Sequence, residues 1–353
     1  MPESTYLSIV LAQRPDGDIV PGKTLNFKEN PILDESNLKD GEILAETLYL
    51  SLDPGLRNSM NDIDRETYMS PVQLGDIMRG WGISKVIASK SSSHPVGSYV
   101  FSLSGWTEMA IIAAKDAEII SIPPNTRVTD GLGLFGITGL TAYFGLIDVG
   151  KIKKGDFVVV SGAAGATGSV ACQIAKLKGA KVLGLAGSKE KVAWLKELGC
   201  DEALNYKDID FKAKFNNATT ELIDVYFDNV GGEILEAAIS RAKDHARFVI
   251  CGAISQYNSP NPAGPRNFVT VIVKRIKMEG FIVLDYEKQF PEARKEIAQW
   301  LAEGKLERKD TIIKGGLKAA EEAFLGLFKG SNTGKLLVEV KSDSDREDMG
   351  SSL

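Results

Sequence analysis

The sequence is poor in the residues that build metal sites, disulfides and membrane spans. Among 353 residues there are only two histidines and three cysteines, and Cys172, Cys200 and Cys251 are too widely spaced for a disulfide framework or a paired-cysteine metal site. The N-terminus lacks the basic start and apolar stretch of a signal peptide, and no run reaches the roughly eighteen apolar residues of a membrane span. We therefore expect a cytoplasmic protein that does not insert into a membrane.

An excess of charge of one sign is also missing. The 42 basic and 47 acidic residues give a net charge of -5, so neither nucleic acid nor an anionic membrane is an expected partner.

The zinc site of an alcohol dehydrogenase would need clustered Cys, His and carboxylate ligands. His94 lies in a serine-rich stretch and His245 precedes a strand. We expect both to be surface or packing residues, and no metal to be bound.

The distribution of turn residues divides the chain into two parts. Residues 1–125 form short strand-like runs, whereas residues 126–304 alternate apolar strands with amphipathic helices, which indicates an α/β domain with a parallel sheet. KLLVEV at Lys335–Val340 is predicted to be a strand that returns to the N-terminal part, so residues 305–341 are assigned to the same domain as residues 1–125. Residues 342–353 are predicted from their composition to be disordered.

The second part contains the most regular pattern of the chain. A glycine-spaced apolar run, Gly131–Leu146, predicts one buried helix. The predicted strands after it are Phe157–Val160, Lys181–Ala186, Asp224–Val230 and Arg247–Ile254, and the predicted helices are Val170–Lys178, Lys189–Leu198 and Arg294–Leu301.

A glycine run, GAAGATG at Gly162–Gly168, lies between the first of these strands and the helix that follows it. Gly162 permits a tight turn, Gly165 lets the backbone approach a pyrophosphate, and Gly168 lets the helix pack closely on the sheet. We assign the whole run, with Ala164, Ala166 and Thr167, to a dinucleotide site. The alternative is a close-packed turn without a ligand.

The end of the second strand discriminates between the two nicotinamide cofactors. NAD-binding folds carry an acid there that binds a ribose hydroxyl, but this sequence has Gly187 and Ser188, followed by Lys191. A hydroxyl and a cation suit a ribose phosphate, so the expected cofactor is NADPH. Taken alone, Lys191 would be a solvated surface lysine.

A series of motifs in order gives the chain a family resemblance. It resembles the zinc-independent medium-chain dehydrogenase/reductases, in the branch of leukotriene/prostaglandin reductases and plant alkenal double-bond reductases. The resemblance extends from about Glu42 to Val340, and its motifs are SLDPGLR (51–57), GLTAYFGL (139–146), the glycine run with its flanks (161–195), YFDNVGG (226–232), CGAISQYN (251–258) and SNTGKLLV (331–338).

The resemblance implies an α/β fold made of a GroES-like β-rich catalytic domain and a Rossmann domain with a doubly wound parallel sheet, assembled as a homodimer. It also implies that the phosphate of NADPH is held by Lys191 and Tyr206, with Ser188 nearby, and that Asn229 lies near the cofactor. The remaining residues that it places along the nicotinamide are Cys251, Gly252, Ala253, Ile254, Ser255, Phe281, Val283 and Asn332.

The implied reaction is reduction of the carbon-carbon double bond of an α,β-unsaturated aldehyde or ketone. Such a reaction needs orientation and stabilisation of the negative charge that develops on the carbonyl oxygen. Tyr257 matches the family tyrosine that could donate to this oxygen. An equally weighted alternative is a loop tyrosine that only packs over the cofactor.

Two positions depart from the family pattern on the substrate side. Gly55 and Trp81 stand where relatives commonly have tyrosines, so two pocket hydroxyls are expected to be lost. A more apolar and roomier pocket favours bulky hydrophobic or aromatic enones over small polar aldehydes, or weaker activity altogether. Two alternatives stay open: an NADPH-dependent quinone reductase of the same fold, and an NADPH-binding sensor without turnover.

Overall fold

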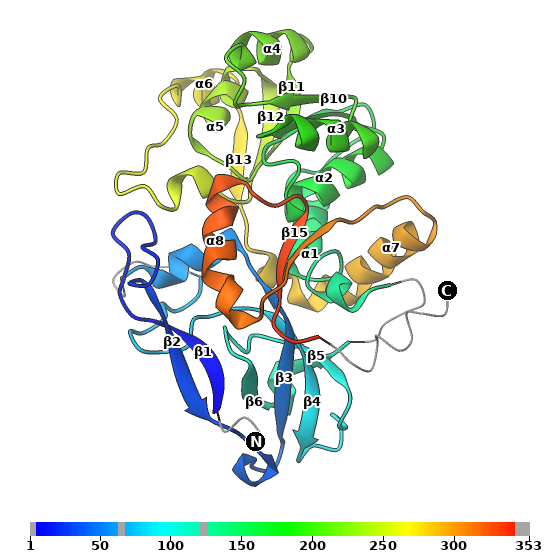
Figure 1. The fold of residues 1–353 in the computed structure, drawn as a ribbon. Coiled ribbons are helices and arrows are strands. Elements are labelled where there is room, and N and C mark those ends of the chain that lie inside the picture. Colours follow the sequence, from blue (N-terminus) through cyan, green and yellow to red (C-terminus); the bar gives the residue numbers. More distant parts are fainter. Residues whose placement is uncertain (1–4, 63–67, 121–125, 343–353) are drawn as a thin grey trace. The chain divides into compact units, whose positions relative to one another are not determined.

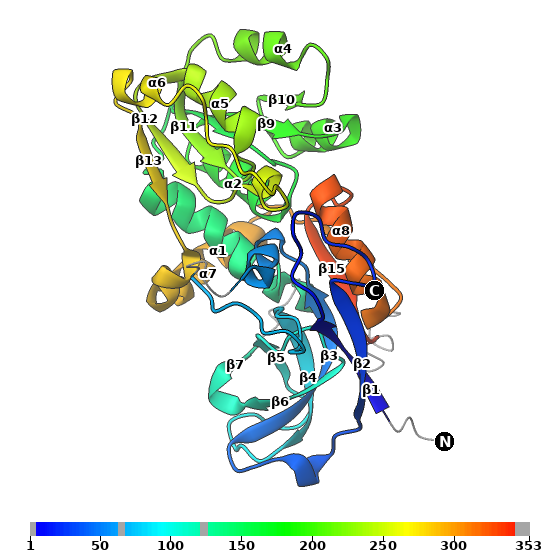
Figure 2. The ribbon, with the colours of Figure 1, turned by 90° about the vertical axis from the view of Figure 1, so that its left-hand side faces the viewer.

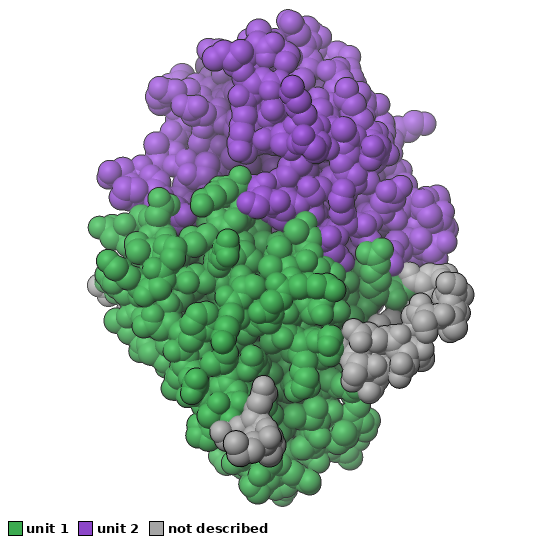
Figure 3. All heavy atoms as spheres, in the orientation of Figure 1, with its two compact units in different colours: residues 1–132, 311–329, 336–353 green, residues 133–310, 330–335 purple. Residues whose placement is uncertain are grey.

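The computed structural model describes residues 5–62, 68–120 and 126–342, which form two compact units. Unit 1 takes its residues from 1–132, 311–329 and 336–353, and unit 2 comprises 133–310 and 330–335 (Figure 3). Residues 126–132 thus belong to unit 1 and residues 305–310 to unit 2, while the domain limits given above stay predictions. Apart from Ser342, the tail predicted to be disordered lies outside the described residues.

Unit 1 is built on a sheet in the order β14-β15-β3-β4-β5-β7, which is antiparallel from β15 to β7, with β6 also paired to β3, and on the separate antiparallel pair β1-β2. The C-terminal strand β15 pairs with β3 through Val338 and Leu50, which confirms the predicted return of the chain. The elements are β1 (Thr5–Leu11), β2 (Leu25–Pro31), β3 (Glu42–Ser51), β4 (Gly82–Ser89), β5 (Tyr99–Ser102), β6 (Met109–Ala113), β7 (Ala117–Ile119), β14 (Asp310–Ile313), α8 (Ala320–Lys329) and β15 (Lys335–Glu339).

The main core of unit 1 joins residues from both ends of the sequence. Trp106 and Phe324 of α8 are fully buried, and their rings meet edge to face with centroids 5.4 Å apart. His94 is also buried, and its ring nitrogens contact the Ser93 hydroxyl and the Ala117 carbonyl. It is therefore a packing residue.

Unit 2 contains a parallel sheet in the order β10-β9-β8-β11-β12-β13. The order reverses between β8 and β11, as in doubly wound nucleotide-binding folds. The elements are α1 (Ile137–Phe144), β8 (Phe157–Val160), α2 (Ala166–Leu177), β9 (Lys181–Ala186), α3 (Lys189–Glu197), β10 (Glu202–Asn205), α4 (Phe211–Ala218), β11 (Ile223–Asp228), α5 (Gly232–Ser240), β12 (Ala242–Ile250), α6 (Val269–Val273), β13 (Lys277–Gly280) and α7 (Phe290–Ala302).

Helices cover both faces of this sheet (Figures 1 and 2). Alternate residues of β8 enter different cores: Val158 and Val160 pack with residues of α1, α2, α3 and α7, whereas Phe157 and Val159 pack with residues of α4 and α5. A strand buried on both faces reads as a continuous apolar run, which is why FVVV was recognisable in the sequence. The predicted α/β class, with a β-rich part and a Rossmann-like parallel sheet, is confirmed.

The helix predicted over Gly131–Leu146 is wrong in its extent. Only Ile137–Phe144 is α-helical, and it is continued by a π-helical turn, Gly145–Val149. The carbonyl of Gly133 accepts hydrogen bonds from the N–H groups of Gly136 and Gly139, so the glycine-rich start closes a turn instead of a helix. The other predicted elements exist with shifted ends: α2 begins at Ala166, and β12 covers Ala242–Ile250.

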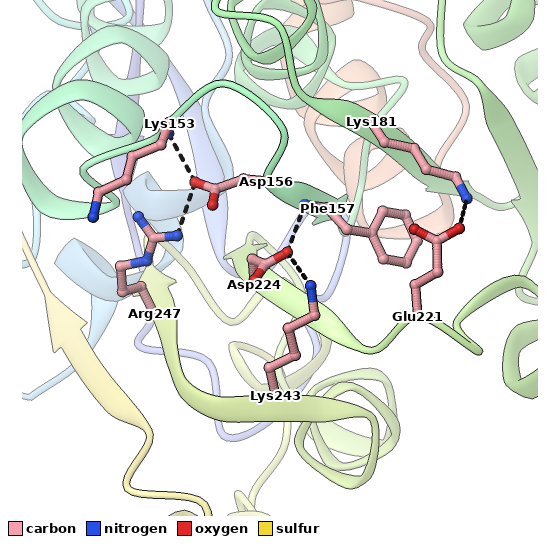
Figure 4. A network of polar contacts seen from close by, with 8 residues as sticks. All are labelled: Lys153, Asp156, Phe157, Lys181, Glu221, Asp224, Lys243 and Arg247. Atoms are coloured by element: carbon pink, nitrogen blue, oxygen red, sulfur yellow. Dashed lines mark hydrogen bonds and ion pairs between the residues drawn. The ribbon is translucent and has the colours of Figure 1, made fainter.

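At the amino edge of the parallel sheet, charged side chains bind strand ends together (Figure 4). Asp156 accepts hydrogen bonds from the backbone N–H of Lys153 and from Arg247, both at 2.8 Å. Arg247 also donates to the carbonyls of Gly150 and Lys151. The carboxylate of Asp156 and the guanidinium of Arg247 are largely buried, with 11% and 20% of their side chains exposed. Removing either partner leaves buried polar groups unsatisfied.

We predict that Asp156→Asn lowers the free energy of unfolding by about 1–3 kcal/mol, because Arg247 loses its buried partner. The matched control is Asp244→Asn, which removes the partner of Arg275 in a pair that is about half exposed on both sides. Screening by water makes such a pair weak. Urea unfolding of both variants checks the contrast, and equal effects would show that the buried pair has no special role.

Candidate dinucleotide site

The glycine run forms the turn between β8 and α2. Gly162 has a φ of +57°, a left-handed conformation that favours glycine. A Cβ at position 168 would lie 2.4 Å from the carbonyl oxygen of Gly162 and 2.8 Å from the Cα of Ala163. The first turn of α2 can therefore approach the end of β8 only with glycine at position 168. This is the close helix-strand packing that the sequence predicted.

The N-terminus of α2 offers backbone N–H groups as hydrogen-bond donors beside the turn. The helix begins after Gly165, which provides no side-chain cap, and the first N–H groups of an α-helix have no partner within the helix. Such groups, together with the helix dipole, favour a phosphate. Ala164 braces the turn from the other side, because its carbonyl accepts a hydrogen bond of 2.8 Å from Gly334.

Asn332 belongs to the same bracing segment of unit 2. Its side-chain amide donates to the carbonyl of Gly334 at 2.7 Å, and only 9% of the residue is exposed. The side chain of Asn332 therefore stabilises the segment 330–335, and the N–H of Gly334 joins this segment to the glycine turn. Asn332 thus lies in the segment that contacts the turn, while its predicted contact with a nicotinamide stays a prediction.

A buried carboxylate organises the strand end beside the turn. Asp228, at the end of β11, is 1% exposed and accepts hydrogen bonds from the hydroxyls of Ser161 and Tyr226 and from the N–H groups of Val230 and Gly231. Burial raises the pKa of Asp228, and these hydrogen bonds oppose the rise. The carboxylate thus joins the carboxyl ends of β8 and β11.

Asn229 follows directly and is held by the same strand end. Its backbone N–H donates to the hydroxyl of Ser161, and its side-chain amide donates to the Ser161 carbonyl at 2.7 Å. A Cβ at Gly162 would lie 3.4 Å from the Cβ of Asn229. The structure therefore places Asn229 against the glycine turn. Asp228 and Ser161 were not predicted from the sequence, although an acid directly after the apolar residues Val225–Phe227 is a recognisable signal.

At the end of β9, Ser188 and Lys191 lie together at the start of α3. Ser188 is the N-cap, and its hydroxyl accepts from the backbone N–H of Lys191 at 3.3 Å. The ammonium group of Lys191 donates to the Gly330 carbonyl at 2.8 Å. Burial, and then the positive charge of Lys207, lower the pKa of Lys191.

Tyr206 lies over the same strand end. A Cβ at Gly187 would be 2.8 Å from its phenol oxygen, and burial raises the pKa of this phenol. The structure thus brings together Ser188, Lys191 and Tyr206, the residues predicted to hold a ribose phosphate. It adds Lys207, which nothing in the sequence distinguishes from other lysines.

The loop after β12 carries Gly252 and Tyr257. The backbone N–H of Ala253 donates to the Tyr257 hydroxyl at 3.1 Å, and a Cβ at Gly252 would lie 3.0 Å from the same oxygen. The phenol is therefore fixed over its own loop. Ile254 and Ser255 belong to a short 3-10 helix, and the backbone N–H groups of both are anchored by carbonyls of the YFDNVGG turn.

Three predicted lining residues are partly or wholly taken up by packing. Val283 is a buried core residue, and Phe281 packs against the same core. Burial raises the pKa of the Cys251 thiol to about 12. The side chain of Val283 thus packs in the core, and its contact with a nicotinamide stays a prediction.

The two expected substrate residues belong to unit 1. Trp81 stacks on Phe101 with ring centroids 4.7 Å apart and planes 4° apart. Gly55 lies in a 3-10 helix, Pro54–Met60, and a Cβ there would be 3.5 Å from the phenol oxygen of Tyr68. A hydroxyl from outside the SLDPGLR motif therefore lies beside Gly55.

Together the reversed strand order, the glycine turn and the phosphate-type residue group define a dinucleotide-binding α/β protein. Within the described ranges, no group of three His, Cys, Asp or Glu residues could hold a metal ion. Nor is any helix there long and apolar enough to cross a membrane.

Comparison with known proteins gives the family. Residues 8–120 match the model for the N-terminal domain of oxidoreductase, and residues 166–299 match that of zinc-binding dehydrogenase. The chain is 43% identical over 343 residues to the putative NADP-dependent oxidoreductase YfmJ of Bacillus subtilis (strain 168), covering 95% of this chain and 98% of the relative. It is 41% identical to prostaglandin reductase 1 of Bos taurus, covering 86% and 91%.

The solved structure of CurA from Vibrio vulnificus in complex with NADPH is also similar, with a TM-score of 0.88 and 36% identity, covering 96% of this chain and all 100% of that one. The chain belongs to the medium-chain dehydrogenase/reductases, in the branch of the prostaglandin, alkenal and curcumin reductases. The resemblance stated from the motifs is confirmed.

We predict that Gly168→Ala lowers the free energy of unfolding by about 1–3 kcal/mol, because its Cβ would overlap the Gly162 carbonyl and force α2 away from β8. The control is Gly264→Ala in a loop of the same unit, where nothing lies within 4 Å of the added Cβ. Thermal or urea unfolding measures both variants. A Gly168→Ala protein as stable as the control would contradict the close approach.

Proposed function

We propose that this protein is an NADPH-dependent reductase of the carbon-carbon double bond of α,β-unsaturated ketones and aldehydes. The observation that carries the proposal is the gathering of Ser188, Lys191 and Tyr206 at the end of β9, where an NAD-binding fold would carry an acid. The relatives named for 2-alkenals and curcumin add the substrate class, since both compounds contain a double bond conjugated to a carbonyl.

The residues fit the cofactor at two separate points. The cradle formed by Gly162, Gly165 and Gly168 has no room for a Cβ at position 168, and it opens onto the N-terminus of α2, which suits a pyrophosphate. About 25 residues further on, the hydroxyl of Ser188 and the ammonium group of Lys191 suit a ribose phosphate. Relatives with NADP or NADPH in their names support the same choice.

The chemistry needs little acid-base machinery from the protein. When bound, NADPH supplies the hydride for the β carbon of the enone. The protein orients the substrate and stabilises negative charge on the carbonyl oxygen. Tyr257 is our candidate donor, because its hydroxyl is fixed by Ala253 on the loop that we assign to the nicotinamide. Asp228 positions the neighbouring turn by holding Val230 and Gly231.

On the substrate side, the stacked rings of Trp81 and Phe101 offer an apolar surface. The phenol oxygen of Tyr68 lies beside Gly55, 3.5 Å from where a Cβ would stand. The stacked rings support hydrophobic or aromatic enones over small polar aldehydes, whereas the Tyr68 hydroxyl returns a polar group to the position beside Gly55.

The rival activity is NADPH-dependent quinone reduction, and a sensor without turnover is the third alternative. The test follows the absorbance of NADPH with a panel of enones, alkenals and quinones, with NADH as the control cofactor. We expect oxidation of NADPH with aromatic enones and slower oxidation of NADH. Oxidation with quinones alone would establish the rival, and oxidation with no substrate would leave only the sensor.

The same assay tests Tyr257. Loss of one charge-stabilising donor is expected to lower kcat of Tyr257→Phe about tenfold or more, with the Kd for NADPH nearly unchanged. If Tyr257 only packs over the cofactor, kcat is retained and the Kd for NADPH changes instead.

We further propose a homodimer formed through the β13 edge of unit 2. β13 ends the sheet order, and α6 exposes an apolar group next to it in the sequence: Phe268, Val269, Ile272 and Val273 are 58–69% exposed. Exposed apolar patches on soluble proteins commonly mark association sites, and an open strand edge favours pairing with a second copy of the same strand.

The proposed compartment is the cytoplasm, where the free thiols of Cys172, Cys200 and Cys251 would stay reduced.

We expect light scattering after size exclusion to give a dimer for the wild type and a monomer for Ile272→Glu, which places a charge in the patch. Ile209→Glu is the matched control, because Ile209 is fully exposed and follows β10, the strand at the other end of the sheet order. A monomeric wild type, or dissociation by both variants alike, would contradict this interface.

A further inference from the structure

We propose that Lys207 is a second cation for the ribose phosphate of NADPH and contributes to the selection of NADPH over NADH. The inference rests on the proposed function, since it assigns one more group to the same phosphate subsite. The subsite comprises Ser188, Lys191, Tyr206 and Lys207, around the end of β9.

The backbone at Gly187 locates Lys207. A Cβ at this position would lie 2.8 Å from the phenol oxygen of Tyr206 and 3.2 Å from the Cε of Lys207. Both side chains therefore lie over the strand end where the sequence lacks an acid. The ammonium nitrogen of Lys207 is 6.0 Å from the centroid of the Tyr206 ring, so the ammonium group and the phenol belong to one surface.

The environment of Lys191 indicates that the positive charge of Lys207 is close to it. The ammonium group of Lys191 donates to the Gly330 carbonyl at 2.8 Å. Burial of this ammonium group lowers the pKa of Lys191, and so does the nearby positive charge of Lys207. Two lysines near the same sheet have carboxylate partners, Lys176 with Asp201 and Lys181 with Glu221. Lys191 instead faces a neutral carbonyl and a like charge, an arrangement that an anion would stabilise.

A phosphate monoester has the chemistry to fill this place. It carries about 1.5–2 negative charges near neutral pH and three acceptor oxygens. Two ammonium groups would balance the charge, while the hydroxyls of Ser188 and Tyr206 could donate to the remaining acceptor positions. A ribose that carries only hydroxyls would leave the repulsion between Lys191 and Lys207 in place.

Calorimetric titration with two fragments that lack the nicotinamide tests the assignment without relying on turnover. Adenosine 2′,5′-bisphosphate carries the phosphate, and 5′-AMP does not. For Lys207→Gln we expect affinity for the bisphosphate to fall about tenfold, as for one lost charge-assisted contact, with binding of 5′-AMP unchanged. Lys207→Arg should keep most of the affinity. The control Lys196→Gln, an exposed lysine at the other end of α3, should bind both fragments like the wild type.

The outcomes separate this inference from the proposed function. If the wild type does not prefer the bisphosphate to 5′-AMP, the NADPH assignment itself is wrong. If the wild type has the preference but Lys207→Gln matches Lys196→Gln, only the role of Lys207 is overturned. Loss of both fragments in Lys207→Gln would also overturn it, because the defect would not concern the phosphate.

Discussion

The buried carboxylate of Asp228 is the constraint on which the candidate site depends. It lies where the strand order of the parallel sheet reverses, and it accepts hydrogen bonds from Ser161 at the end of β8 and from the turn after β11. A charge in an apolar core is costly unless several donors satisfy it. The donors are therefore held in one arrangement, and with them the backbone on both sides of the dinucleotide cradle.

Two further backbone features complete this edge of unit 2. Gly168 permits α2 to approach β8 so closely that its N-terminus faces the turn, and Gly334 joins the 330–335 segment to Ala164. Because Lys191 binds the carbonyl of Gly330, the phosphate subsite and the bracing segment share one contact. The glycine turn and the group of Ser188 and Lys191 are thus connected through residues 330–335, as one continuous dinucleotide site would require.

The sequence predicted well those parts of the molecule that leave strong local patterns, such as apolar strands and glycine turns. The α/β class, β8, β9 and the return of β15 to β3 were all recognisable. The extent of the helix predicted over Gly131–Leu146 was wrong, because apolar content alone does not show that Gly133 and Gly136 close a turn. Lys207 and Tyr68 were missed because their placement depends on tertiary contacts beside Gly187 and Gly55.

The central claim is hydride addition to the double bond of an enone, and isotope transfer tests it most directly. Turnover of an aromatic enone with NADPH deuterated at the transferred position should give a saturated ketone with deuterium at the β carbon, as read by NMR of the product. In ordinary water the α carbon should gain a proton. Deuterium on the carbonyl carbon, with an alcohol as product, would contradict the account.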